Sequence, residues 1–508
     1  MPDPVRIALQ PLGESFELER GTPLQDVLFA HGVEFPCGGR ARCKGCRVRV
    51  ARGALPITPE QQGLLSAEEL AAGWRLSCCC KAENDLTLEL GQWEAAILAD
   101  HSIFDFTPRQ GLGVAVDLGT TTLVAQLLDL RNAHVLAVRT ALNHQASSGA
   151  DVMSRISFAL KENGLRRLSG LVRAQIGKLI AELLEASKAG SSRIEAITVV
   201  GNTVMHHLFC GIDVAPLSHY PFEPERDGLE VLRACELGWE LSGDPAVRFL
   251  PCLGGFVGSD ILAGILATRL DESDPLVALV DLGTNGEIVI GNRERLLCAS
   301  TAAGPAFEGA RISMGMRAAT GAISAVSIEG GALRCHVLGN VAPRGICGSG
   351  LVDAVAAGLD LGLIQPSGRL PNGTNGTLML CPPVALTQND IRELQLAKGA
   401  IAAGIRLLLA SWGAEAKDLT QLYLAGAFGN YISRASARRI GLLDFPPDMV
   451  TPAGNTALLG AKLALFNTRD EEFAYSSLRR KAQHISLNTE PNFQDVFVEE
   501  MSFPPTPT

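Results

Sequence analysis

Four cysteines near the N-terminus have the spacing of ligands for an iron–sulfur cluster. Cys37, Cys43 and Cys46 lie within the segment FPCGGRARCKGC, and Cys78 follows in the segment RLSC. A cluster with two irons requires four thiolates, and three on one tight loop with a fourth from a distant segment can surround it. The glycines beside these cysteines allow the loop to curl around a metal. The pattern therefore predicts a [2Fe–2S] cluster with Cys37, Cys43, Cys46 and Cys78 as metal ligands.

Two alternatives stay open for these cysteines. Zinc could bind the first three of them, although zinc sites usually combine two Cys-x2–4-Cys pairs. Cys79 and Cys80 follow Cys78 directly, and the alternation of side chains along a strand would place Cys78 and Cys80 on the same face. We expect Cys78 to be the fourth ligand because of its RLSC context, with Cys80 as the reserve candidate.

Basic residues surround the loop that carries three of the cysteines. They are Arg40, Arg42, Lys44, Arg47 and Arg49. This basic collar could be a solvated positive surface with no further role. It could equally be a docking surface for an acidic redox partner, and its cations would then also favour the reduced, more negative cluster.

Two segments much further along the chain carry the sequence Asp-Leu-Gly-Thr between apolar strands. The first loop begins at Asp117 and the second at Asp281. In each loop a glycine allows close approach of the backbone, hydroxyl and N–H groups can hold phosphate, and the aspartate can hold Mg²⁺ directly or through water. One such loop is a weak signal, because a tight hairpin alone could produce it, but two such loops are a strong one.

The two loops predict a set of site residues. The expected phosphate contacts are Gly119, Thr120, Thr121, Thr122, Gly283, Thr284 and Asn285. Asp117 and Asp281 are the expected catalytic carboxylates that position Mg²⁺ and water. Glu287 could orient the attacking water, with a solvated strand carboxylate as the alternative, and Asp260 could face the same cleft.

The bulk composition bounds the class of protein. The chain has 508 residues, 47% of them hydrophobic, 5% aromatic and 19% charged, which suits two to four well-packed α/β domains. A net charge of −10 argues against a nucleic-acid partner. We expect no membrane span and no export signal. The 13 cysteines are odd in number and mostly scattered, which indicates reduced thiols and hence a cytoplasmic location.

The sequence pattern changes twice along the chain. Residues 1–95 read as two short strands, a helix, the cysteine loop and further strands, which is the order of a β-grasp domain. Residues 96–111 have no strong period and are expected to be a linker. From residue 112 the pattern becomes α/β, and a second strand–turn–strand with the same Asp-Leu-Gly-Thr loop begins near residue 277, which indicates a weak internal duplication.

The order of these motifs resembles the actin, sugar-kinase and heat-shock chaperone ATPase superfamily. ITVVGNT (197–203) falls where the first connecting strand belongs, LYLAGAFGN (422–430) where the adenosine-binding glycines Gly426 and Gly429 belong, and GNTALLGAKLA (454–464) resembles the second connecting helix. The cysteine spacing is similar to the adrenodoxin-like branch of the [2Fe–2S] ferredoxins. The resemblance implies an α/β multidomain fold, with a β-grasp [2Fe–2S] ferredoxin-like domain (1–95) before a two-lobed actin-like ATPase of duplicated ribonuclease-H-like design. Its lobes are expected at 112–270 and 271–470, with a C-terminal tail (471–508) packed on the ATPase.

Within this superfamily the chain resembles the reductive activators of corrinoid-dependent methyltransferases, which fuse a [2Fe–2S] domain to such an ATPase. The segments that carry the resemblance are GADVMSRI (149–156), VVGNTVMHHLFCGID (199–213), GGFVGSDILAGIL (254–266), AAGPAFEGARISMGMRA (302–318), PRGICGSGLVDAV (343–355) and LTQNDIRELQLAKGAI (386–401). The resemblance implies an enzyme that uses ATP and Mg²⁺ to pass one electron from the cluster to a Co(II) corrinoid, restoring Co(I). Gly304, Gly348 and Gly350 are expected to line the nucleotide cleft, with helix-terminus packing as the alternative.

The family resemblance also implies partners. We expect a corrinoid protein of a methyltransferase system and an external low-potential electron donor, with no nucleic acid and no membrane, and a homodimer is one expected arrangement. Two other functions stay open. One is an electron-transfer module with an ATPase-like scaffold or sensor domain, and the other is a redox-regulated small-molecule kinase. The adjacent His206 and His207 are expected to be core or helix-cap groups rather than cobalt ligands.

Overall fold

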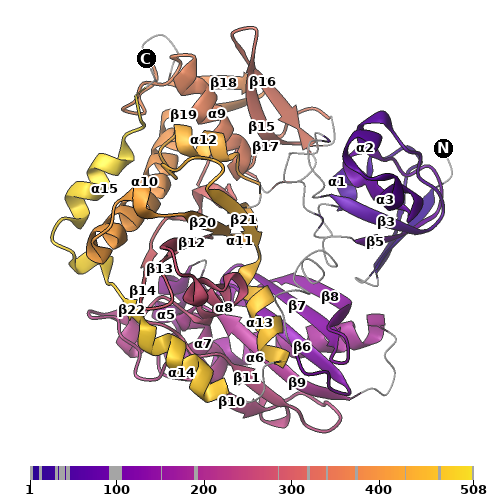
Figure 1. The fold of residues 1–508 in the computed structure, drawn as a ribbon, viewed down its shortest axis with the longest axis vertical. Coiled ribbons are helices and arrows are strands. Elements are labelled where there is room, and N and C mark those ends of the chain that lie inside the picture. Colours follow the sequence, from indigo (N-terminus) through magenta and orange to yellow (C-terminus); the bar gives the residue numbers. More distant parts are fainter. Residues whose placement is uncertain are drawn as a thin grey trace.

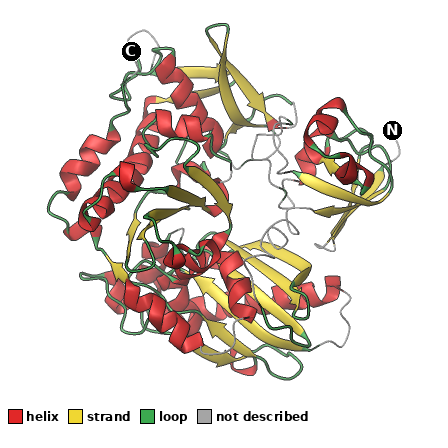
Figure 2. Ribbon diagram, in the orientation of Figure 1, coloured by secondary structure: helices red, strands yellow, loops and turns green. Residues whose placement is uncertain are grey.

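The chain forms an N-terminal domain and two larger lobes, each built on its own sheet (Figure 1, Figure 2). In this computed structural model the described residues are 4–10, 14–28, 33, 41, 46–90, 106–149, 151–187, 193–283, 285–309, 311–316, 318, 321–338, 341–371, 376–429, 431–466 and 471–505. The mixed α/β multidomain architecture that the sequence predicts is confirmed.

The N-terminal domain contains a five-stranded sheet with the order β2-β1-β5-β3-β4. Its strands are β1 (Val5–Gln10), β2 (Glu14–Leu18), β3 (Arg47–Arg52), β4 (Trp74–Leu76) and β5 (Leu86–Leu90). β1 and β5 run parallel while the other neighbours run antiparallel. This is the β-grasp arrangement expected from the sequence. Alternate side chains such as Ile7, Leu9, Val48 and Leu88 are fully buried and form the core.

Two short helices of this domain are not evident from apolar periodicity. They are α2 (Pro59–Leu64) and α3 (Ala67–Ala71), and they precede β4. α3 begins with a capping box, in which Ser66 accepts from the backbone of Glu69 and the Glu69 carboxylate accepts from the backbone of Ser66. The Ser-x-x-Glu sequence is therefore the local signal that predicts this helix start.

The first lobe contains a six-stranded sheet with the order β10-β11-β9-β6-β7-β8. Its strands are β6 (Leu112–Leu118), β7 (Thr122–Asp129), β8 (His134–Leu142), β9 (Ile194–Gly201), β10 (Glu230–Arg233) and β11 (Ala246–Phe249). β6, β7 and β8 form an antiparallel meander, and β9 and β11 continue the sheet in parallel to β6.

The second lobe repeats this design with the order β21-β20-β12-β13-β14-β22. Its strands are β12 (Val277–Leu282), β13 (Gly286–Gly291), β14 (Leu296–Thr301), β20 (Gln421–Ala425), β21 (Val450–Gly454) and β22 (Ala482–His484). β12, β13 and β14 form the meander, and β20 and β21 run parallel to β12. The weak duplication seen in the sequence is therefore a duplication of strand topology.

Helices cover both faces of the first sheet, because successive strand residues point to opposite faces. Val114 and Val116 of β6 pack with the long helix α6 (Gly164–Ser187) and with α7 (Thr203–Cys210). Ala115, between them, belongs to the cluster formed by α8 (Ser259–Thr268) and α13 (Thr456–Phe466). α8 and α13 pack closely on each other, although α13 follows the last parallel strand of the second lobe.

The second lobe has its own large core around α9 (Gly348–Asp360) and α10 (Gln388–Trp412). α10 is long and apolar enough to cross a membrane by composition, but it is mostly buried and packs on β13, β14 and the helix α15 (Phe493–Met501). We therefore read it as a core helix. Two small sheets extend this lobe, formed by β15 (Ala322–Glu329), β16 (Ala332–Val337) and β17 (Gly345–Ile346), and by β18 (Thr377–Cys381) and β19 (Val384–Thr387).

The C-terminal segment contacts both lobes. In α14 (Glu471–Lys481), Arg479 forms an ion pair of 2.6 Å with Asp227, which lies in the first lobe. The next residues form β22, which pairs with the edge strand β14 of the second sheet, and α15 then packs on α10. The segment expected as a tail is thus regular structure that joins the two halves.

Candidate functional site

The two Asp-Leu-Gly-Thr loops open on one shared cavity of ≈ 450 Å³. The first loop joins β6 to β7 and the second joins β12 to β13, so each loop is the tip of the first β-hairpin in its lobe. The sequence-predicted residues that line the cavity are Asp117, Gly119, Thr120, Thr121, Thr122, Asp260, Asp281, Gly283, Asn285, Glu287, Gly348 and Gly426. Thr284 lies outside the described residues. Two loops far apart in the sequence are therefore brought face to face.

Three predicted glycines do not reach this lining. A Cβ on Gly350 would lie 2.1 Å from the carbonyl oxygen of Ile323, so close packing of α9 on β15 explains this glycine. A Cβ on Gly429 would lie 3.0 Å from the Leu424 side chain, while Gly304 has a φ of +77° before a short 3₁₀ turn. For these three residues, packing and backbone conformation are the physical reasons for glycine.

The cavity also contains residues that the sequence did not single out. They are Val124, Asn202, Leu282, Phe307, Glu308, Met316, Ala318, Cys347, Ser349, Phe428, Tyr431, Asn455 and Ala457. Asn202 and Asn455 both occur in the triplet Gly-Asn-Thr directly after a parallel strand. That repeated triplet is the signal that could have identified them.

Among the described residues, five carboxylates line the cavity, and the pKa values of four of them, Asp117, Asp260, Asp281 and Glu287, are raised. Burial raises the pKa of Asp117 to about 6 against a hydrogen bond from Asn455 that lowers it. Burial and the neighbouring Asp117 raise the pKa of Asp281 to about 7. Burial and the charge of Asp281 raise the pKa of Asp260 to about 7 as well. Burial, Asp260 and Asp281 together raise the pKa of Glu287 well above its ordinary value.

No Lys or Arg is among the described residues that line this cavity. The same loops present backbone N–H groups and hydroxyls suited to phosphate, whose negative charge would add to that of the carboxylates. A divalent cation held by oxygen ligands would offset the negative charge of the carboxylates, and it would allow phosphate to bind beside them. Although no three described carboxylates already form a closed metal-binding group, the donor set fits Mg²⁺ with a nucleotide better than either alone.

The first phosphate loop is held by three asparagines. Asn143 donates from Nδ2 to the Gly119 carbonyl at 2.9 Å, and Asn202 donates from Nδ2 to Oγ1 of Thr120 at 2.8 Å. Asn455 donates from Nδ2 to Oδ2 of Asp117 at 2.8 Å. Each contact starts from a different element, and Asn455 follows β21 of the second sheet, so the position of the loop depends on the packing of both lobes.

A buried arginine supports the same loop from behind. Arg155 is fully buried and lies in α5 (Val152–Ala159). It donates from Nη2 to the Thr120 carbonyl at 2.6 Å and from Nε to the Gly149 carbonyl at 2.9 Å. Burial lowers its pKa to about 10, against the charge of Asp151. A guanidinium is retained here because its rigid fork satisfies several carbonyls at once.

The opposite side of the cavity suits a nucleotide base and further phosphate oxygens. Phe307 and Phe428 stack with ring centroids 4.7 Å apart, and Gly426 has a φ of +85°, which only glycine adopts at low cost. A Cβ there would lie 2.6 Å from Oδ1 of Asp281. α9 directs its N-terminus, at Gly348 and Ser349, into the cavity, and its N-cap residue Cys347 makes no side-chain cap bond. Free N–H groups at such a terminus are well placed to bind phosphate.

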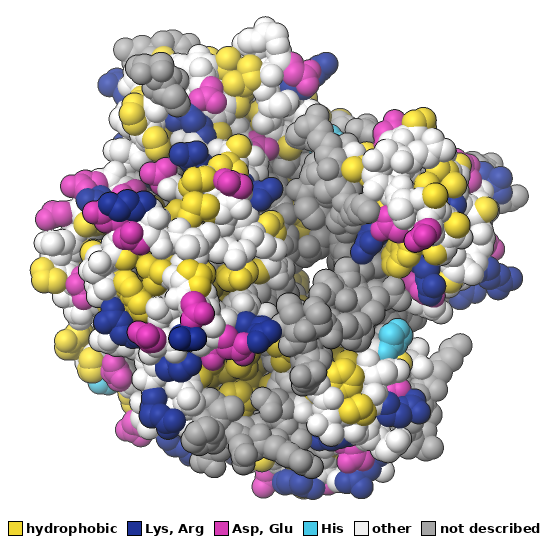
Figure 3. Space-filling view, viewed as in Figure 1, with side chains coloured by type: hydrophobic (Ala, Val, Ile, Leu, Met, Phe, Trp, Pro, Cys, Tyr) yellow, Lys and Arg dark blue, Asp and Glu magenta, His cyan; other side chains and the backbone are white. Residues whose placement is uncertain are grey.

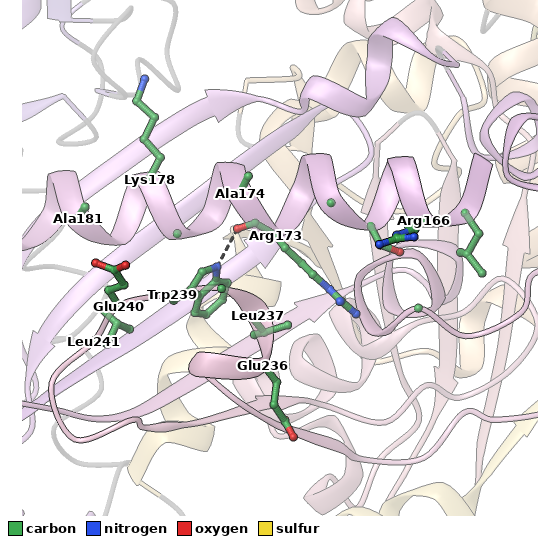
Figure 4. A pocket seen from close by; sticks show the side chains of 16 residues that line it. Arg166, Arg173, Ala174, Lys178, Ala181, Glu236, Leu237, Trp239, Glu240 and Leu241 are labelled. Carbon is green, nitrogen blue, oxygen red and sulfur yellow. Dashed lines mark hydrogen bonds between the residues drawn. The ribbon is translucent and has the colours of Figure 1, made fainter. Parts of the chain in front are cut away.

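A larger cavity of ≈ 1110 Å³ lies elsewhere on the first lobe, between α6 and the 236–241 turn (Figure 4). Its wall is formed where Trp239 donates from Nε1 to the Arg173 carbonyl at 2.8 Å. Arg173 in turn donates from Nε to the Phe209 carbonyl at 2.7 Å. Because these groups serve packing and none of the predicted site residues lines it, this cavity is not the candidate site despite its volume.

The N-terminal domain holds the second candidate site. Ser77–Cys79 form a 3₁₀ turn rather than a strand, so the alternation expected for Cys78 and Cys80 does not apply. Hydrogen bonds with the thiols of Cys46 and Cys79, together with burial, raise the pKa of Cys78, which places Cys78 against Cys46. Cys37 and Cys43 lie outside the described residues.

Cys80 is directed elsewhere. Its thiol donates to the Leu76 carbonyl at 3.3 Å and accepts from Nε2 of Gln61 at 3.5 Å. Burial raises its pKa to about 12, and both of its hydrogen-bond partners lie within the domain core. Two facing thiols on separate segments fit the ligand pattern of a cluster, and this geometry favours Cys78 over Cys80.

Part of the basic collar has local partners. Arg47 pairs with Glu69 at 3.0 Å and lies over the ring of Trp74, and Arg49 pairs with Glu89. Arg40, Arg42 and Lys44 lie outside the described residues. On the face drawn in Figure 3, positive and negative side chains are interspersed over the two lobes rather than gathered by sign. The collar as a docking surface stays a prediction.

His206 and His207 are fully buried in α7. His206 packs edge-on against Phe249 and lies 3.2 Å from the Gly228 carbonyl, and burial lowers its pKa to about 3. His207 lies 2.8 Å from the Thr203 carbonyl through Nδ1. Both rings are core groups, as the sequence led us to expect.

Comparison with known proteins places these features together. Three family descriptions match: a 2Fe-2S iron-sulfur cluster binding domain at residues 7–83, the RACo middle region at 112–273, and the C-terminal domain of RACo, the ASKHA domain, at 276–508. The chain is 34% identical over 439 residues to the corrinoid activation enzyme RamQ of Eubacterium limosum, covering 80% of this chain and 74% of that protein.

Two further similarities extend over most of the chain. The [Co(II) methylated amine-specific corrinoid protein] reductase of Methanosarcina barkeri is 29% identical over 425 residues, which cover 77% of each protein. The solved structure of a reductive activator for corrinoid,iron-sulfur protein superposes with a TM-score of 0.69 at 27% identity, covering 99% of both chains.

Proposed function

The chain belongs to the family of reductive activators of corrinoid proteins, and on this premise we propose how its two sites share one reaction. It is an ATP-dependent enzyme that passes one electron from a [2Fe–2S] cluster to the Co(II) corrinoid of a methyltransferase system, restoring Co(I). The observation that carries the proposal is that both phosphate loops open on one carboxylate-lined cavity, in a chain whose N-terminal domain holds two facing thiols.

We assign the nucleotide site as follows. Asp117 and Asp281 would hold and orient Mg²⁺ and its water, and Glu287, which lies opposite Asp281 on the neighbouring strand, would accept a proton from the attacking water. The phosphate contacts are Gly119, Thr120, Thr121, Thr122, Gly283, Thr284, Asn285 and Gly348. When bound, Mg²⁺ supplies positive charge to the transferring phosphoryl group. Gly426 and the Phe307–Phe428 pair form the side of the cavity that suits the base.

The cluster site is assigned to the thiolates of Cys37, Cys43, Cys46 and Cys78. When bound, the [2Fe–2S] cluster supplies the capacity to take up and release a single electron. The protein contributes the Ser77–Cys79 turn, which directs Cys78 toward Cys46.

The energetic need for ATP follows from the reaction. Each 59 mV by which a one-electron transfer is uphill makes its equilibrium about tenfold less favourable. Nucleotide binding and hydrolysis can offset this only if they favour one conformation of the activator or its complex over another. Closure of the two lobes around the nucleotide is the conformational change that the shared cavity permits.

Several finer assignments belong to the same proposal. The partner is a corrinoid protein, an external low-potential donor reduces the cluster, and the protein works in the cytoplasm, with a homodimer as one arrangement. We also propose 1–95, 96–111, 112–270, 271–470 and 471–508 as the ferredoxin-like domain, linker, two lobes and C-terminal segment.

An anaerobic absorbance assay tests the function. Cluster-loaded protein, a chemical reductant and a Co(II) corrinoid protein are mixed with and without Mg²⁺ and ATP, and loss of the Co(II) absorption is followed. We expect reduction only with ATP, and ATP hydrolysis stimulated by the Co(II) partner. Equal reduction without nucleotide would instead support an electron-transfer module with a passive ATPase-like body, and a phosphorylated small molecule would support a kinase.

A further inference from the structure

We propose that α13 transmits the state of the nucleotide cavity to the linker that carries the N-terminal domain, with Asn455 and Phe466 as the positioning residues at its two ends. This inference rests on the proposed nucleotide site at Asp117 and goes further, because it identifies the element that couples nucleotide to the electron-carrying domain.

The N-terminal end of α13 is tied to the cavity. Asn455 precedes the helix, and its Oδ1 accepts a hydrogen bond from the Leu458 backbone at 2.8 Å, which caps the first turn. The same side chain donates from Nδ2 to Oδ2 of Asp117. One exposed amide therefore contacts both the proposed Mg²⁺-positioning carboxylate and the start of α13.

The C-terminal end of α13 is tied to the linker. The ring of Phe466 packs on the ring of Phe106 with centroids 4.8 Å apart. Arg109 donates from Nη2 to the Leu465 carbonyl, while its backbone N–H donates to the Leu130 carbonyl at 3.0 Å. Residues 106–111 lead from the N-terminal domain into β6, so α13 spans the path between cavity and linker.

α13 is closely packed against its neighbours, and it is short enough to move as a rigid helix. Its 11 residues span about 16 Å at the rise of an α-helix. A Cβ on Gly460 would lie 2.1 Å from the Ala263 carbonyl of α8, so the two helices touch along their backbones. α8 itself begins beside Asp260, another carboxylate of the same cavity. In Figure 1, α13 lies beside β6 of the first lobe.

The contact at Asp117 gives the coupling its direction. Asn455 bonds to Oδ2 of Asp117, one of the two carboxylate oxygens that a cation could use, so a cation at Oδ2 would compete with the Asn455 bond. Release of Asn455 loosens the cap and shifts α13 relative to the first loop. Because the helix is packed as a unit with α8, the shift reaches Phe466 and the linker.

Hydrogen exchange of the full-length, cluster-loaded protein tests this. Exchange is measured in peptides covering 106–112 and 117–122, with and without Mg²⁺ and adenylyl imidodiphosphate. In the wild type we expect the nucleotide to slow exchange in the loop peptide and to change exchange in the linker peptide, where Arg109 and Leu112 donate backbone bonds.

Two variants separate the ends of the helix. Phe106→Ala removes the ring contact from the linker side without opening a cavity in α13, and we expect the loop response to persist while the linker response is lost. Asn455→Ala should also lose the linker response at saturating nucleotide. Phe106→Leu should restore part of it. Ser66→Ala, which removes the side-chain cap of α3 in the N-terminal domain, is the matched control and should change neither peptide.

The outcomes are distinct. A linker response that persists in both Phe106→Ala and Asn455→Ala overturns the role of α13. If the nucleotide protects the loop peptide of the wild type but does not change exchange in the linker peptide, the role of α13 is also overturned. The proposed function is then left intact. No protection of the loop peptide at any nucleotide concentration overturns the nucleotide part of the proposed function, and the coupling with it.

Discussion

Glu287 lies directly opposite Asp281 across the antiparallel strands β13 and β12. The corresponding position opposite Asp117 in the first lobe is Val124. The two halves therefore share strand topology but differ in chemistry, because only the second lobe adds a carboxylate beside its loop aspartate. This asymmetry assigns different tasks to the two lobes.

Glu287→Gln should reduce ATP hydrolysis while leaving nucleotide binding. The amide keeps the shape of the side chain and its contact with Ser300 at 3.4 Å but cannot accept a proton. Loss of a general base costs about 10²–10⁴-fold in rate. Single-turnover hydrolysis and equilibrium binding measure the two effects. Glu329→Gln, at an exposed ion pair with Arg334, is the control, and an unchanged hydrolysis rate in Glu287→Gln would remove Glu287 from the mechanism.

Asp281→Asn should stabilise the nucleotide-free protein at alkaline pH. The folded pKa of Asp281 is raised to about 7, above its unfolded value of about 4. The carboxylate therefore favours folding least when it is ionised, and the stability it contributes below pH 4 is lost as pH rises through about 7. We expect the variant to gain on the order of 1–2 kcal/mol at pH 8 and nothing near pH 4.

Chemical denaturation at both pH values checks the Asp281→Asn prediction. Asp274→Asn, at an exposed ion pair with Arg293, is the matched control. The variant should also lose the added stability that Mg²⁺ and ATP confer on the wild type, because the cation loses a ligand. Lower stability of Asp281→Asn at pH 8 would contradict the assigned electrostatics.

Cys78→Ser and Cys80→Ser should have opposite effects on the cluster. Cys78 faces Cys46, whereas Cys80 bonds to the Leu76 carbonyl within the core. We expect Cys78→Ser to lose iron and visible absorbance, and Cys80→Ser to retain both with some loss of stability from a hydroxyl in a thiol's place. Iron analysis and the visible spectrum of anaerobically prepared protein decide this. Loss of iron from Cys80→Ser alone would reassign the fourth ligand.

Arg155→Met should weaken both folding and nucleotide binding. The carbonyls of Thr120 and Gly149 would lose their buried donor, at about 1–3 kcal/mol for each unsatisfied group. Arg155→Lys should recover part of the stability but less of the affinity, because a lysine cannot reproduce the fork. Unfolding curves and nucleotide titrations measure these effects, with Arg167→Met on an exposed helix face as control. Unchanged affinity in Arg155→Met would show that the first loop keeps its position without this support.

The sequence predicted those features whose physical cause is local. Strand alternation and tight turns sufficed for the β-grasp order and for the duplicated hairpins, and the fold class is confirmed. The Asp-Leu-Gly-Thr loops were recognisable because their aspartate, glycine and threonine act within a few residues of one another. The short helix α3 is an exception: its Ser66–Glu69 capping box is also a local signal, but the helix lacks the apolar periodicity by which the other helices were found.

Residues that act through tertiary contacts were not predictable in the same way. Asn455 contacts Asp117 across 338 positions of sequence, so nothing local indicates its partner. Conversely, Gly350 was expected near the nucleotide because of its neighbours, while its backbone meets Ile323 in a packing contact. Alternation along a strand also misdirected the pairing of Cys78 with Cys80, since the chain turns there instead of extending.

The pairing of β22 with β14 has a consequence for the behaviour of shortened chains. β14 would otherwise be the outer strand of its sheet, with one row of backbone donors and acceptors uncovered. Such a row is a template for strands from other molecules. Removal of residues 471–505 should therefore cause self-association before any loss of nucleotide or iron binding. This segment thus protects the protein against aggregation.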